Sequence, residues 1–223
     1  MMPDAGSFLL LLLWGGWVAI DSTSVGQLMV SRPVVAASVA GWIAGDPVGG
    51  ALLGLMLEAL QLTVLPFGAA RYSEAGPAAV VGAGVLAGHA TNATLLLLTV
   101  FFALSWGWVG GNSVRNLRQF NVRLIARAGA PGSSPSSLER WHAVAILTDY
   151  LRGMLLVGTG VPLLALFLMG STTVWGLNEP LARIAVWAAV AAGCGATLRL
   201  FGAKRRFLFA AGVLCGSLFL LLV

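Results

Sequence analysis

The sequence contains few charged residues. Only 9% of its 223 residues are Asp, Glu, Lys or Arg, whereas a soluble domain carries about 25%. So few charges cannot cover a water-facing surface. The chain is also 58% hydrophobic, with a mean hydropathy of +0.91. This composition excludes a soluble enzyme and predicts an all-α, polytopic protein whose solvent is the lipid bilayer.

Metal-binding and catalytic motifs are also absent from the sequence. Cys194 and Cys215 lie in separate apolar segments without metal-ligand spacing, and they are expected to be small buried residues. His89 and His142 have no second metal ligand at a useful distance along the chain. The sequence contains no nucleophile elbow, no His-Glu-x-x-His and no phosphate-binding loop. We therefore expect no metal, no cofactor and no enzymatic activity of the chain's own.

The basic residues, which give a formal net charge of +5, lie in short clusters between apolar stretches. This pattern is typical of cytoplasmic loops rather than of nucleic-acid binding. The two clusters, 112–140 and 199–206, should face the cytoplasm, and the loop at 170–180 should face outward. Within the first cluster, arginines at helical spacing predict an amphipathic helix on the membrane surface. These arginines are Arg115, Arg118, Arg123 and Arg127.

The length allows about six to eight transmembrane or partial helices in one membrane domain, 1–223. Three parts are expected: a substrate-site region with discontinuous helices (1–92), a cytoplasmic amphipathic helix and linker (112–140) and C-terminal spans (141–223). The first apolar segment, which lacks a preceding Lys or Arg, is interpreted as a retained span. Apolar segments are expected at 7–20, 33–44, 48–65, 78–86, 94–109, 144–169, 181–200 and 207–223.

The first third contains apolar runs that are too short or too interrupted to span a membrane. Asp46-Pro47 separates the runs 33–44 and 48–65, and a second polar stretch follows Pro66. Such segments indicate broken or re-entrant helices around a binding site within the membrane. Ordinary interfacial loops are the alternative. Glycines four residues apart also predict close helix packing, although glycine is common in membrane helices. They are Gly41, Gly45 and Gly49, and then Gly50 and Gly54.

Charged residues in this third of the chain need a physical explanation. They are Asp21, Arg32, Asp46, Glu58, Arg71 and Glu74. An isolated charge at the bilayer centre costs at least about 2.5 kcal/mol, so most must be paired, near an interface or in a cavity. Glu58 and Gln61 share a helix face, which suits hydrogen bonding to sugar hydroxyls or a proton or cation relay. The alternative is a structural salt bridge from Glu58 to Arg32 or Arg71.

Four features in order resemble the IIC membrane subunit of mannose–fructose–sorbose-type sugar phosphotransferase systems (PTS). They are Asp21 with Gln27 and Arg32-Pro33, the Gly-x-x-x-Gly-Asp turn from Gly41 to Asp46, the run from Gly54 to Glu58, and Gly68-Ala-Ala70 followed by Glu74. The segment 112–155 is also similar, with an arginine-bearing helix, Glu139-Arg140-x-His142 and Leu151-Arg152-Gly153.

The resemblance implies a membrane subunit of the bacterial inner membrane that forms the recognition and translocation pathway for a hexose or amino sugar. A IID membrane subunit and cytoplasmic IIA and IIB phosphocarriers are the implied partners, and a homo-oligomer is left open. The implied substrate-binding residues are Asp21, Gln27, Glu58 and Glu74, with Gln61 beside Glu58 and with Arg32 and Arg71 as charge partners. The alternative function is a non-transporting membrane sensor or scaffold of the same fold.

Overall fold

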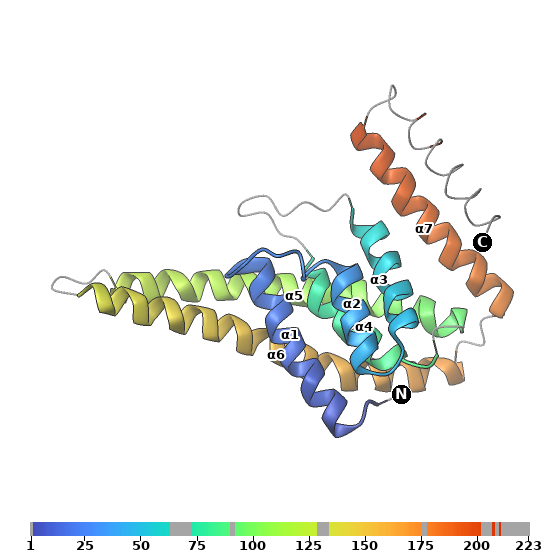
Figure 1. Cartoon of the computed structure of the whole chain (residues 1–223). Coiled ribbons are helices and arrows are strands. Elements are labelled where there is room, and N and C mark those ends of the chain that lie inside the picture. The colour runs from blue at the N-terminus through green and yellow to red at the C-terminus, as the bar shows by residue number, and fades with distance from the viewer. Residues whose placement is uncertain are drawn as a thin grey trace.

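The computed structural model describes residues 2–62, 73–89, 92–128, 134–174 and 178–201, together with Phe207 and Ala210. Every regular element in these ranges is a helix, which confirms the all-α prediction (Figure 1). The helices are α1 (Ala5–Thr23), α2 (Pro33–Ile43), α3 (Pro47–Gln61), α4 (Ala75–Leu86), α5 (Ala93–Ala128), α6 (Pro135–Val174) and α7 (Glu179–Phe201). Arg71, residues 202–206 of the second basic cluster and most of the last apolar run lie outside the described residues.

Helix lengths divide the first six helices into two groups. Three helices are long and apolar enough to cross a membrane: α1, α5 and the part of α6 that ends at Ser171. By contrast, α2, α3 and α4 have 11, 15 and 12 residues, so each is about 16–23 Å long. The hydrocarbon core of a bilayer is about 30 Å thick. The prediction of short helices in the first third is therefore confirmed.

Local chemistry explains where the short helices begin. Pro33 occupies the first position of α2 and Pro47 that of α3, where the missing N–H of proline has no cost. The Asp46 side chain accepts a hydrogen bond from the amide of Gly49, 2.8 Å away, and so caps α3. Gly45 has a φ of +87°, which glycine adopts without strain. The expected break at Asp46-Pro47 is thus a tight turn between two antiparallel helices.

Close packing of α2 against α3 depends on glycine. A Cβ on Gly41 would lie 2.8 Å from the Cα of Gly50, and a Cβ on Gly54 would lie 2.7 Å from the Cα of Val34. These distances leave no room for a side chain. The glycine prediction is therefore confirmed for Gly41, Gly50 and Gly54, whereas Gly45 serves the turn.

The helix α4 lies at the centre of the fold, where every residue from Gly76 to Leu86 is buried. Around it pack α1, α2, α3, α5 and α6. The helices α1 and α6 approach closely at a second glycine contact, where a Cβ on Gly153 would lie 3.0 Å from the Cα of Gly16. The fully buried side chains of the core include Leu11, Val18, Leu53, Val80, Val157 and Leu164.

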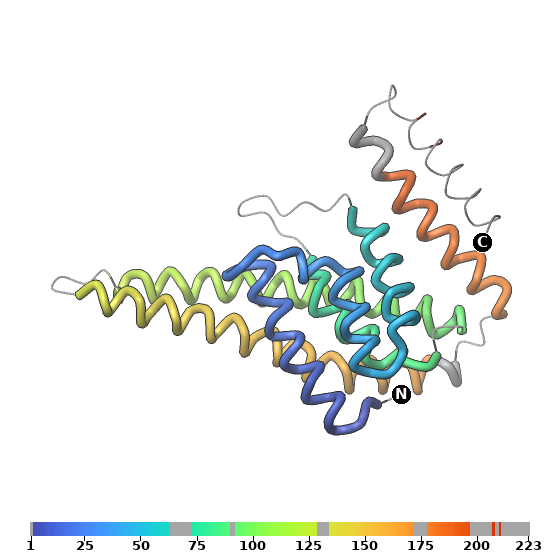
Figure 2. Tube along the Cα trace, in the orientation of Figure 1, coloured from blue at the N-terminus to red at the C-terminus, as the bar shows by residue number. Residues whose placement is uncertain are grey.

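The helices α5 and α6 form a long hairpin that extends away from the other helices (Figures 1 and 2). The helix expected within 112–140 is not a separate element, because its four arginines on 115–127 belong to the continuous helix α5. The sequence of α5 contains no proline, so the helix continues from its apolar half into its arginine-bearing half. The expected linker and outward loop are also shorter than predicted, since α6 begins at Pro135 and continues to Val174.

Candidate functional site

Four helix ends meet on one side of the fold: the end of α1, the start of α2, the end of α3 and the start of α4. Three contacts join them. Asp21 bonds to Ser31, Arg32 pairs with Glu58, and Ser22 donates to Glu74. The fold therefore gathers side chains that are more than 50 residues apart in the sequence. We call this region the polar end.

Asp21 organises the turn that leads into α2. Its Oδ1 accepts a hydrogen bond of 2.6 Å from the amide of Leu28, and its Oδ2 accepts one of 2.9 Å from the amide of Ser31. The turn has positive φ at Gly26, at Gln27 (+50°) and at Met29 (+64°), which is costly for non-glycine residues. The carboxylate is buried, whereas Gln27 is exposed. Asp21 thus holds a strained turn that presents Gln27.

Glu58 on α3 forms an ion pair with Arg32, the residue that precedes α2. The Arg32 side chain is 49% exposed and the Glu58 side chain 17% exposed. The second carboxylate oxygen of Glu58, Oε2, is buried and has no hydrogen-bond partner among the described residues. Since nearly all buried polar atoms in proteins are satisfied, this oxygen is a position where a donor from a ligand or water would be stabilised.

Gln61 follows Glu58 by one helical turn at the end of α3 and is half-buried. It therefore lies on the same face of the helix as Glu58. The segment that follows, residues 63–72, includes Arg71 and lies outside the described residues. Of the two partners expected for a structural salt bridge to Glu58, the structure pairs it with Arg32.

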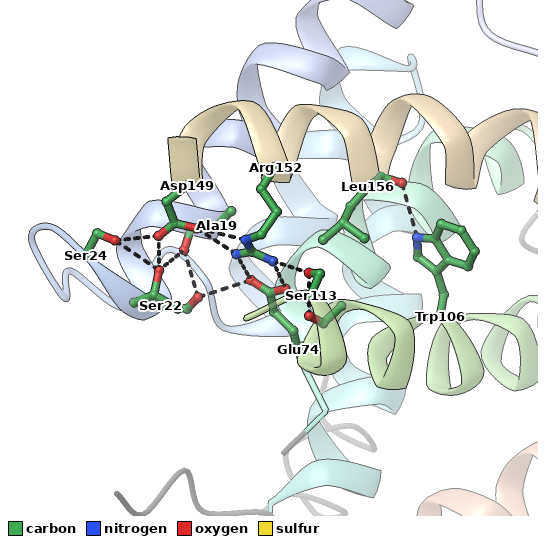
Figure 3. A network of polar contacts seen from close by, with 11 residues as sticks. Ala19, Ser22, Ser24, Glu74, Trp106, Ser113, Asp149, Arg152 and Leu156 are labelled. Atoms are coloured by element: carbon green, nitrogen blue, oxygen red, sulfur yellow. Dashed lines mark hydrogen bonds and ion pairs between the residues drawn. The ribbon is translucent and has the colours of Figure 1, made fainter. Parts of the chain in front are cut away.

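Glu74 has a different environment (Figure 3). Its side chain is 1% exposed, and both of its oxygens accept hydrogen bonds from the guanidinium of Arg152 on α6, at 2.6 and 2.7 Å. Arg152 also pairs with the fully buried Asp149 at 2.8 Å. Its NH1 donates to Ser113 on α5, also at 2.8 Å. The geometry is that of a bidentate arginine–carboxylate pair with its remaining donors satisfied.

The end of α1 completes this network. The hydroxyls of Thr23 and Ser24 donate to Oδ2 of Asp149, and Ser22 donates to Oε1 of Glu74 at 3.4 Å. The network therefore joins α1, α5 and α6 to the start of α4. Arg152, Glu74 and Asp149 together have a formal charge of −1, and the hydroxyl groups of α1 and its C-cap donate to the carboxylate oxygens.

The sequence-predicted site residues thus fall into two groups. Gln27, Arg32, Glu58 and Gln61 lie at the polar end with side chains that are exposed or only half-buried. Asp21 and Glu74 are buried, and groups of the protein itself occupy their carboxylates.

Sequence analysis missed the role of Asp149 and Arg152. Both interrupt the apolar run 144–169, and the cost of burying a charge in a bilayer applies to them as it does to the first third of the chain. That cost was the signal that could have found them.

Comparison with known proteins supports the fold and a family. The family model described as "PTS system sorbose-specific iic component" matches residues 5–179. A solved structure described as "Structure of membrane protein" superposes with a TM-score of 0.73 at 17% sequence identity, covering 96% of this chain and 87% of that one. At this identity the likeness shows the fold alone. No curated protein matches the chain.

Proposed function

Because this chain belongs to the family of sorbose-specific IIC components of the phosphotransferase system, we propose that it forms the recognition and translocation pathway for a hexose or amino sugar. It is a membrane-embedded sugar-transport subunit, and its family associates with other components of the same system. In our proposal a IID membrane subunit completes the pathway in a bacterial inner membrane. The sugar is phosphorylated on the cytoplasmic side by IIA and IIB phosphocarriers.

Sugar recognition is assigned to the exposed and half-buried group at the polar end. Glu58 accepts hydrogen bonds from sugar hydroxyls, Gln27 and Gln61 donate and accept through their amides, and Arg32 pairs with the Glu58 carboxylate. The observation that supports this most strongly is the buried Oε2 of Glu58, which has no hydrogen-bond partner among the residues that the structure describes. A hydroxyl donor there would satisfy an acceptor that otherwise costs about 1–3 kcal/mol. Arg71 remains a proposed second charge partner.

Asp21 and Glu74, whose carboxylates already have partners, are assigned to positioning. Asp21 fixes the turn that carries Gln27 and precedes Arg32. Glu74 fixes the start of α4 against α6. In this proposal their loss weakens sugar binding through the shape of the polar end.

Sugar-induced thermal stabilisation of the chain co-purified with its IID subunit tests the proposal. Hexoses and amino sugars are screened, and at least one should raise the melting temperature. Glu58→Gln, which keeps the shape but not the charge, should abolish the shift. Glu139→Gln, at the exposed start of α6, is the matched control and should retain it. The proposal fails if no sugar stabilises the complex, or if the chain transports sugar without IID.

A further inference from the structure

We propose that the projecting half of the α5–α6 hairpin is the docking surface for the cytoplasmic phosphocarrier that delivers the phosphoryl group. This half, here called the arginine arm, comprises residues 112–128 of α5 and 135–143 of α6. The inference rests on the proposed function, because it names the part of this chain that receives a soluble component of the system.

Charge is the first argument. The arm has five arginines, Arg115, Arg118, Arg123, Arg127 and Arg140, all exposed at the surface. Glu139 is the only carboxylate in the sequence from 112 to 143. Such an excess of positive charge attracts an acidic surface and speeds its association at low salt.

Exposed apolar side chains are the second argument. Val122 and Ile125 are each 66% exposed. Val114, Leu117 and Leu124 on the same helix are, in contrast, buried. Helical spacing places Val122 and Ile125 on the face of α5 that also carries Arg115. Arginine mixed with apolar side chains is typical of protein–protein interfaces.

The reach of the arm favours a soluble protein over lipid headgroups. The apolar half of α5 ends before Asn112, and Arg127 follows 15 residues later, or about 22 Å along the helix. The headgroup layer on each side of the hydrocarbon is only about 5–8 Å thick. Arg123 and Arg127 therefore lie beyond the headgroups when the hairpin continues the direction of its membrane-crossing half.

The base of the arm joins the buried network. Ser113, at the start of the arm, accepts a hydrogen bond of 2.8 Å from Arg152, and Arg152 holds Glu74. A partner bound to the arm is thus held on the side of the molecule where the polar end lies. That is the side on which a phosphocarrier must meet an arriving sugar.

Binding of the purified IIB component to the full chain in phosphatidylcholine nanodiscs, without sugar, tests the inference. The double variant Arg123→Glu/Arg140→Glu should raise the Kd by about tenfold or more, and the neutral variant Arg123→Gln/Arg140→Gln by less. Raising the salt from about 50 to 300 mM should weaken wild-type binding several-fold. Arg183→Glu is the control, because exposed Arg183 lies on α7 beside Glu179, which contacts the opposite end of α5.

Unchanged binding by the charge-reversed variant would overturn the inference, as would binding that is insensitive to salt. A dependence of IIB binding on added phosphatidylglycerol, equal in wild type and variant, would also overturn it in favour of lipid. The sugar-induced thermal shift is measured on the same samples. If IIB binding follows the arginines while no sugar stabilises the complex, sugar recognition fails and the docking surface stands. If only docking fails, the sugar shift persists.

Discussion

Arg152 on α6 holds both oxygens of Glu74, 78 residues earlier in the chain, through hydrogen bonds of 2.6 and 2.7 Å. The same guanidinium pairs with Asp149. Among the described residues, the salt bridges of both carboxylates are made by Arg152. One arginine thus pairs with both buried carboxylates and ties the start of α4 to α6.

Replacing Arg152 by Met should destabilise the protein by about 3–5 kcal/mol, because it leaves two buried carboxylates without their counter-ion. The free energy of unfolding in mild detergent measures this loss. In the double variant Arg152→Met/Glu74→Gln, part of the stability should return, since one unpaired charge is removed. Arg183→Met, which breaks an exposed pair of 3.5 Å with Glu179, should cost no more than about 1 kcal/mol. Equal stability of Arg152→Met and wild type would show that the network contributes nothing to the fold.

Gly50→Ala should separate α2 from α3 and lower the melting temperature, with a cost of about 1–3 kcal/mol from overpacking. Its Cβ would lie 2.8 Å from the Cα of Gly41. The nearest atoms belong to the backbone of α2, so no flexible side chain can move aside to make room. The matched control is Gly195→Ala on α7, where a Cβ meets nothing within 4 Å. Alanine should be neutral or slightly stabilising there. A neutral Gly50→Ala would refute the close contact.

Sequence reasoning succeeded where a single local property determined the structure. Low charge indicated a membrane, prolines and Asp46 marked the starts of the short helices, and glycine spacing located the α2–α3 contact. Each of these signals is either a composition or a short motif that can be recognised without knowing which distant residues are in contact.

Sequence reasoning failed where partners are distant in the chain. The burial cost of a charge indicates that Glu74 needs a counter-ion, but nothing local indicates that Arg152 supplies it. The surface helix was predicted from the arginine spacing of 112–128 alone. The sequence does not reveal that this part of α5 packs as one helix against α6, with Leu117 and Leu124 buried.

Asp21→Ala should weaken sugar binding about tenfold or more while costing only about 1–3 kcal/mol of stability. Without the carboxylate, the amides of Leu28 and Ser31 lose their acceptor, and the strained turn at Gln27 relaxes. Faster hydrogen exchange at those two amides would report the change directly. Asp21→Asn retains an acceptor and should recover part of the affinity.

Asp46→Ala is the control for this experiment, because Asp46 caps the other end of α3 and accepts from Gly88 at 2.9 Å. It should lower stability without changing the sugar affinity of the folded fraction. If Asp21→Ala and Asp46→Ala reduced affinity equally, the positioning role of Asp21 would be refuted.

Acidification should weaken the contact between α5 and α7. Glu179, which lies outside the three candidate spans, accepts a hydrogen bond of 2.8 Å from the amide of Ala93 at the start of α5. This bond, with contributions from Thr94 and Arg183, lowers the pKa of its carboxyl from the ordinary 4.5. A carboxyl whose pKa is lower in the folded than in the unfolded protein stabilises the fold at pH values above its unfolded-state pKa. This contribution is lost as the pH falls through its folded-state pKa. The difference in melting temperature between wild type and Glu179→Gln should therefore be largest near neutral pH and shrink below about pH 4.5. A difference that stays constant down to pH 3, or grows, would show that the carboxylate charge does not hold the two helices together.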